Sequence, residues 1–108
     1  MTVAELASAL NLTPVALGDP QREVTGGYAG DLLSWVMGRA QAGDAWVTIM
    51  SNANIVAVAT LADTALIVLA EGVTLEEDVA ALAQAKGINV YTSPLDTFTL
   101  CGKIAALL

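Results

Sequence analysis

The chain has 108 residues, 56% of them apolar, and its eleven acidic and four basic residues give a formal net charge of −7. The length is that of one domain, large enough to bury a core without metal ions or disulfides. The basic residues form no positive stripe, which excludes nucleic acid and anionic membranes as partners. The chain has no histidine and one cysteine, Cys101, which excludes imidazole metal sites, His-based catalysis and an intramolecular disulfide. We therefore expect a single cytoplasmic domain over 1–108, with no cofactor, nucleic acid or membrane partner.

The first predicted helix begins at a capping box. Thr2 and Glu5 stand three residues apart, the spacing at which each side chain accepts a hydrogen bond from the other's backbone amide. We expect this helix to end near Asn11. Residues 13–17 then form an extended strand whose proline suits the edge of a sheet, and a turn follows at 18–21.

Glycines dominate the next stretch of the chain. Arg22 to Thr25 are expected to extend briefly, and Gly26, Gly27 and Gly30 then form a loop that leads into a helix. Asp31 is placed near the N-cap of this helix, where a carboxylate accepts free amides and opposes the dipole.

Strands and helices alternate from residue 43 onward. We expect strands at 45–50, 66–69 and 88–92, and helices at 55–62, 75–86 and 98–107. Thr74 is the expected cap of the helix at 75–86, whose first turn carries the acidic residues that the dipole favours. Three consecutive strand–helix units predict a mainly parallel sheet covered by helices through right-handed crossovers. The strand at 13–17 could pair at either edge of this sheet.

The last predicted helix is apolar on nearly every side. A helix of this kind must be buried on more than one side, either between layers of the core or against a second copy. Together with Trp35, Trp46 and the high apolar content, this favours a homodimer. We expect Cys101 to lie on the apolar face of the helix with Phe98 and Ile104, as a buried and inert thiol.

The glycine loop is the first candidate binding element. Gly26-Gly27-x-x-Gly30 before a helix resembles phosphate-binding turns, although it matches neither the dinucleotide nor the P-loop pattern. Asp31 would also repel a phosphate there. Positive backbone φ angles or close packing explain the glycines equally.

A second cluster, Ser51, Asn52 and Asn54, follows a predicted strand. This places it at the sheet edge where ligands bind in open α/β folds, although plain helix caps account for these residues as well. The candidate ligand- or partner-binding residues from both clusters are Arg22, Thr25, Gly26, Gly27, Asp31, Ser51, Asn52 and Asn54.

Two blocks, at 23–37 (Glu-Val-Thr-Gly-Gly-Tyr, then Asp-Leu-Leu-Ser-x-Val-Met) and 54–59 (Asn-Ile-Val-Ala-Val-Ala), resemble the DRTGG domain family. The resemblance extends over the lead-in helix, the strand entry at 43–48 and the terminal helix. It implies a three-layer α/β fold similar to the N-terminal domain of HPr kinase/phosphorylase, with helices on both faces of a mainly parallel sheet. The Asp-Arg pair of the family name has no counterpart here, since Arg22-Glu23-Val24 precedes Thr25.

The resemblance also implies an accessory module. DRTGG domains occur beside CBS pairs in regulated pyrophosphatases, ahead of phosphotransacetylase, and as small stand-alone bacterial proteins, some encoded near hydrogenase and kinase-like ATPase components. We therefore predict a non-enzymatic regulatory or protein-interaction module acting as a homodimer, with a kinase-like ATPase or hydrogenase-associated component as its protein partner. The alternative is a sensor of a small ligand, an adenine nucleotide, with its crevice at Thr25–Gly27 and Ser51–Asn54.

Overall fold

A five-stranded sheet in the order β1-β5-β4-β3-β2 forms the middle layer of the computed structural model, which describes all 108 residues. β2 to β5 run parallel, and β1 joins β5 antiparallel at one edge. The strands are β1 (Thr13–Ala16), β2 (Gly26–Ala29), β3 (Asp44–Thr48), β4 (Leu66–Leu69) and β5 (Val90–Thr92); the helices are α1 (Val3–Leu10), α2 (Leu33–Arg39), α3 (Asn54–Ala62), α4 (Glu77–Ala85) and α5 (Thr97–Leu107).

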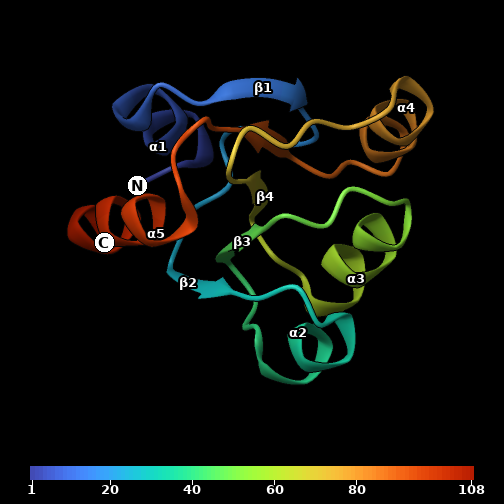
Figure 1. Cartoon of the computed structure of the whole chain (residues 1–108), viewed down its shortest axis with the longest axis horizontal. Coiled ribbons are helices and arrows are strands. Elements are labelled where there is room, and N and C mark those ends of the chain that lie inside the picture. Colours follow the sequence, from blue (N-terminus) through green and yellow to red (C-terminus); the bar gives the residue numbers. More distant parts are fainter.

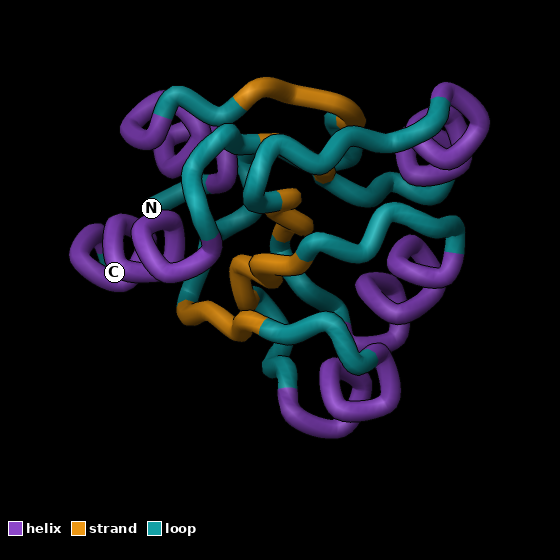
Figure 2. Tube along the Cα trace, in the orientation of Figure 1, coloured by secondary structure: helices purple, strands orange, loops and turns teal.

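Helices cover both faces of this sheet (Figures 1 and 2). The chain steps from β2 to β5 in one direction across the sheet, and right-handed crossovers in one direction place every connecting helix on the same face. α2, α3 and α4 therefore lie together on one side, and α1 and α5 cover the other. The predicted three-layer α/β architecture is confirmed.

The core is divided into two clusters by the central strands. Every residue of β3 and β4 is buried, and successive side chains point to opposite faces. Val47 and Val68 pair in register and pack toward α1 and α5, whereas Trp46 and Ile67 pair and pack toward α2, α3 and α4. β4 and the middle of β3 are apolar because both faces of a covered parallel sheet are dry.

Several sequence predictions are confirmed at the level of single residues. Thr2 and Glu5 form the capping box of α1, with hydrogen bonds of 3.1 and 2.8 Å to each other's backbone amides. The strand that contains Pro14 lies at an edge, paired with β5, which decides the pairing that the sequence left open. Residues 54–62 are helical although they are rich in β-branched side chains.

Two local predictions are wrong. Gly26–Ala29 form strand β2 and not a loop, because their backbone pairs with β3 in parallel register, Gly27 beside Ala45. Thr74 does not cap α4: this helix begins at Glu77, and its N-cap residue Glu76 makes no side-chain capping bond.

Candidate functional site

Asp31 joins the carboxyl ends of β2 and β3. Its Oδ1 accepts a hydrogen bond of 2.7 Å from the hydroxyl of Thr48 and one of 3.0 Å from the amide of Ile49. The sequence suggested that the carboxylate of Asp31 would accept the free amides of α2. The N-cap of α2 is instead Leu32, and the carboxylate of Asp31 accepts its hydrogen bonds from Thr48 and Ile49. The indole of Trp46 adds a third bond between the same strands, donating to the carbonyl of Gly30 at 2.9 Å.

Ser51, Asn52 and Asn54 lie beyond the carboxyl end of β3, as predicted from their position after a strand. The side chain of Asn52 accepts a hydrogen bond of 2.9 Å from the amide of Asn54, which orders the first turn of α3. Both asparagines are exposed, and neither of the two cavities described below includes them.

Arg22, Thr25 and Gly26 lie at the opposite, amino edge of the parallel strands. The register of β2 and β3 sets Gly26 beside Asp44, and the amide of Thr25 donates to the carbonyl of Gly43 at 3.0 Å. Since Ser51 follows the far end of β3, the structure does not bring residues 25–27 and 51–54 together. The single crevice expected from these two segments is not formed.

Arg22 is anchored to the end of α3. Its guanidinium donates 2.8 Å to the carboxylate of Asp63 and 2.7 Å to the carbonyl of the same residue, with a longer contact of 3.4 Å to the carbonyl of Thr64. A cation at the carboxyl end of a helix opposes the helix dipole. The hydrogen bond and the charge of Arg22 hold the pKa of Asp63 below its usual value.

A polar cavity of about 280 Å³ opens beside Arg22, between the ends of α3 and α4. Asn89, which is 3% exposed, fixes its wall by donating 2.8 Å to the carbonyl of Asp19 and 2.9 Å to that of Ala65. Lys86 also lines the cavity, so two of the four basic residues meet here. Lys86 and Asn89 are not among the residues predicted for the site; the available signal was an asparagine within the strand predicted at 88–92.

An apolar groove of about 270 Å³ lies between α5 and the edge strand β2. Gly27 and Ala29 form its floor with Val47, and its walls include Cys101 and Ala105 of α5 and the C-cap residue Leu108. The groove exists because β2 contributes almost no side-chain volume on this face. A Cβ on Gly27 would meet a single atom within 4 Å, the Ala45 oxygen at 3.6 Å.

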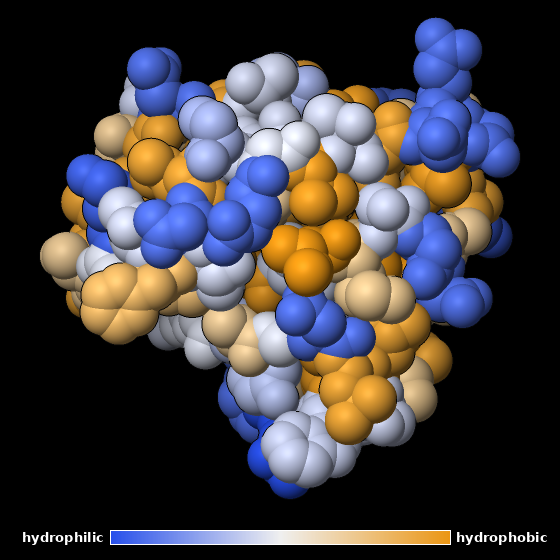
Figure 3. All heavy atoms as spheres, in the orientation of Figure 1, coloured by the Kyte–Doolittle hydropathy of each residue, from blue (hydrophilic) through white to orange (hydrophobic).

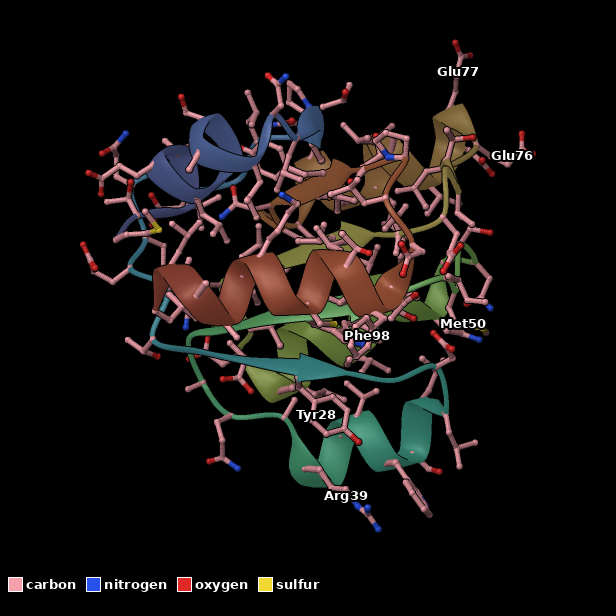
Figure 4. The ribbon with its side chains drawn as sticks, turned by 60° about the vertical axis from the view of Figure 1, so that its left-hand side comes forward. Tyr28, Arg39, Met50, Glu76, Glu77 and Phe98 are labelled. Atoms are coloured by element: carbon pink, nitrogen blue, oxygen red, sulfur yellow. The ribbon has the colours of Figure 1, made fainter.

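Phe98 is not packed on the apolar face of α5 with Ile104, as the sequence suggested. It is 89% exposed, whereas Ile104 is 3% exposed. Figure 4 shows Phe98 projecting from α5 on the side nearer β2, and in Figure 3 a pale-orange patch lies at the left of the molecule, where α5 is, beside blue and white atoms. Cys101 is half-buried, and this burial raises the pKa of its thiol.

No group of three or more Cys, Asp and Glu side chains is placed to hold a metal ion. None of the helices combines the length and the hydropathy needed to span a bilayer.

A model of the DRTGG domain matches residues 29–107. The chain belongs to the DRTGG domain family. The matched range of this DRTGG protein begins at the last residue of β2, so it includes Asp31 and residues 51–54 but not Arg22 or residues 25–27. No curated protein matches the chain.

A solved structure shows the same fold as this DRTGG protein. It contains the CBS and DRTGG domains of the regulatory region of Clostridium perfringens pyrophosphatase, in complex with the activator diadenosine tetraphosphate. The TM-score is 0.74 over 95% of this chain, and 18% of the residues are identical. The DRTGG protein spans 45% of that chain, and at this identity the likeness establishes the fold.

Proposed function

We propose that this DRTGG protein is a non-enzymatic regulatory module of the cytoplasm that acts as a homodimer and binds a protein partner. The observation that carries the proposal is the outer surface of α5, where Phe98 is 89% exposed beside an apolar groove. An exposed aromatic side chain on the helix that forms one wall of an apolar groove supports an interaction site there. The partner that the family resemblance supports is a kinase-like ATPase or a hydrogenase-associated component.

The chemistry of the side chains supports a module without catalysis. Cys101 has a raised thiol pKa, the opposite of what a nucleophilic cysteine requires. With no histidine in the chain, the hydroxyl of Ser34 has no imidazole to activate it. Asp31, the best-placed carboxylate of the predicted site, already accepts two hydrogen bonds from β3.

Sedimentation equilibrium of the purified protein tests the homodimer. We expect a mass of twice the 11.0 kDa of one chain, with a monomer–dimer equilibrium on dilution. A mass of 11.0 kDa throughout the accessible concentration range would overturn this part of the proposal. Titration of the dimer with the purified ATPase or hydrogenase component, followed by the same measurement, tests the partner.

An adenine-nucleotide sensor is the second candidate function. It is supported by the nucleotide activator bound in the regulatory region of the similar pyrophosphatase and by Arg22 and Lys86 in the polar cavity, where Arg22 is paired with Asp63 and Asp19 also lines the wall. At about 280 Å³, this cavity lies just below the ~300–1,000 Å³ typical of ligand sites. A nucleotide would therefore place its phosphates near Arg22 and Lys86 and extend beyond the rim.

A thermal-shift series with AMP, ATP and diadenosine tetraphosphate tests the sensor. A ligand at about 100 times its dissociation constant stabilises the fold by roughly 2.7 kcal/mol. The shift should disappear in Lys86→Gln and persist in Lys103→Gln, which changes a cation outside the polar cavity. If no nucleotide shifts the melting temperature, the sensor is ruled out and the interaction module stands.

A further inference from the structure

Three residues form one exposed stripe on α5. Phe98, Gly102 and Ala105 are spaced i, i+4 and i+7, which places them on one side of a helix. Phe98 is 89% exposed, and Gly102 and Ala105 are exposed as well. We call these three residues the α5 stripe.

The fold of a single chain does not require the side chains found in the α5 stripe. Phe98 leaves nearly all of its ring in water, where it contributes little to the core. A glycine in the middle of a helix is less favourable than alanine, yet a Cβ at Gly102 would meet nothing within 4 Å. Both residues would gain a role only if another surface packed against the stripe.

The charge distribution is compatible with a second copy of the chain as that surface. Each copy carries a formal charge of −7, so two copies repel each other wherever acidic side chains would meet. The α5 stripe and β2 contain no charged residue. On α5, Lys103 is five residues from Phe98 and therefore about 140° around the axis, and the acidic residue nearest to Phe98 in the sequence is Asp96 at the N-cap, outside the stripe. Two copies can meet at this face without opposing like charges.

Phe98, which we call the knob, and the apolar groove are also spaced for reciprocal packing. Phe98 and Ala105 are seven residues apart, which is about 10 Å along the helix, and Ala105 lines the groove. A two-fold axis between positions 101 and 102 sets two α5 helices antiparallel and brings each Phe98 beside the partner's Ala105. The same operation places Gly102 at the crossing point, where a missing side chain allows close approach.

We propose that two copies pair through antiparallel α5 helices, with Phe98 of each copy filling the apolar groove of the other. This arrangement rests on the proposed homodimer and specifies how it forms. It is isologous, since the knob of each copy meets the groove of the other, and it closes at two subunits. The aromatic ring supplies the buried anchor and the groove supplies its pocket, the pattern of a binding hot spot.

Three variants measured by sedimentation equilibrium test the knob and the groove separately. Phe98→Ala removes the knob from an exposed position, and Gly27→Val fills the groove from the opposite element, where a Cβ has ordinary contact distance. We expect each to weaken the dimer about 30-fold or more, as truncation of a hot-spot aromatic does. Leu107→Ala is the matched control, because Leu107 is exposed on α5 and lies outside the groove; it should leave the dimer unchanged.

Oxidative cross-linking tests the antiparallel register. Two Cys101 residues would lie about 1.5 Å apart along the helix axes, whereas two residues at position 106 would lie about 13 Å apart. A disulfide needs Cα atoms roughly 4.4–6.8 Å apart. We expect mild oxidant to link the wild-type dimer through Cys101, and not to link Cys101→Ser/Ala106→Cys, although Ala106 is exposed.

The outcomes separate this inference from the homodimer itself. A wild-type dimer that Phe98→Ala and Gly27→Val both leave intact, or that links through position 106 and not 101, would overturn the reciprocal packing and keep the homodimer. A monomeric wild type would overturn both. Circular dichroism and the melting temperature of each variant at monomeric concentration establish that a lost dimer is not a lost fold.

Discussion

The hydroxyl of Thr48 donates a hydrogen bond of 2.7 Å to the carboxylate of Asp31, which fastens the end of β3 to the end of β2. Thr48 is 1% exposed, so this bond lies at the margin of the core. β2 needs such a fastening because it is an edge strand whose first two residues are Gly26 and Gly27. Glycines provide no side chains to pack against the neighbouring strand.

Removing this bond should lower the free energy of unfolding. We expect Asp31→Ala to cost about 2 kcal/mol, in the range for hydrogen bonds to a charged group, because two donors of β3 lose their acceptor. Thr48→Val should cost less, and the double variant should cost clearly less than the sum of the two, since both remove the same bond. Urea denaturation of the four proteins checks this. Additivity within about 0.5 kcal/mol would show that the two residues do not interact.

Arg22 and Asp63 should make stability dependent on pH. The folded-state pKa of Asp63 is lowered by the hydrogen bond and the charge of Arg22. The contribution of Asp63 to the free energy of unfolding is therefore complete above the ordinary carboxylate pKa of about 3.9. It is lost as the pH falls through the lowered pKa of the folded state. We expect Asp63→Asn to melt below the wild type at pH 7 and to approach it near the acid end of the range.

The same pair predicts the effect of losing the cation. Arg22→Gln removes the guanidinium bonds to the end of α3, and we expect a cost of about 1–2 kcal/mol at pH 7. For a chain of this size that corresponds to a melting temperature lower by roughly 5–10 °C. Lys103→Gln is the control, because Lys103 forms neither a side-chain hydrogen bond nor an ion pair. Equal melting temperatures for the two variants would contradict a specific role of Arg22.

The elements with strong local signals were predictable from the sequence. The strand at 66–69 is a continuous apolar run, and the structure has the same bounds. The helix predicted at 75–86 is followed by Gly87, whose φ of 72° is the conformation that glycine provides just after a helix. β2 was not predictable in this way, because Gly-Gly-Tyr-Ala lacks the β-branched alternation that identifies a strand. It is a strand because β3 pairs with it.

That one error also explains the misplaced crevice. With only a brief extended segment expected at 22–25 and a loop at the glycines, the sequence did not show at which edge of the sheet Thr25 lies. In the structure the strand begins at Gly26, so Thr25 precedes it and lies at the amino edge. The apolar groove was also not predictable from the sequence. The small side chains of β2 leave a cavity only because α5 lies over them, and the sequence does not show that placement.

Two glycines with opposite surroundings should respond oppositely to alanine. A Cβ on Gly18 would overlap the backbone carbonyl of Gly87, and neither backbone can yield without moving the β1–β2 connection. We expect Gly18→Ala to cost more than about 2 kcal/mol. A Cβ on Gly38, within α2, would meet nothing within 4 Å, so Gly38→Ala should stabilise the fold by about 0.5–1 kcal/mol through helix propensity. Thermal melts show whether each substitution stabilises or destabilises the fold. An unchanged melting temperature for Gly18→Ala would show that the loops containing Gly18 and Gly87 move apart easily.

Thr64 presents the reverse case of Thr48. Thr64 is 6% exposed, and its hydroxyl has no hydrogen-bond partner within the protein, so no protein group offsets the desolvation cost of this hydroxyl. Valine keeps the shape of threonine and removes the hydroxyl, so we expect Thr64→Val to raise the free energy of unfolding by about 1 kcal/mol. Thr48→Val, with the same chemical change at a bonded hydroxyl, should lower it. If both substitutions destabilise by similar amounts in urea, the hydroxyl of Thr64 has a partner in solution, and the wall of the polar cavity is the place to find it.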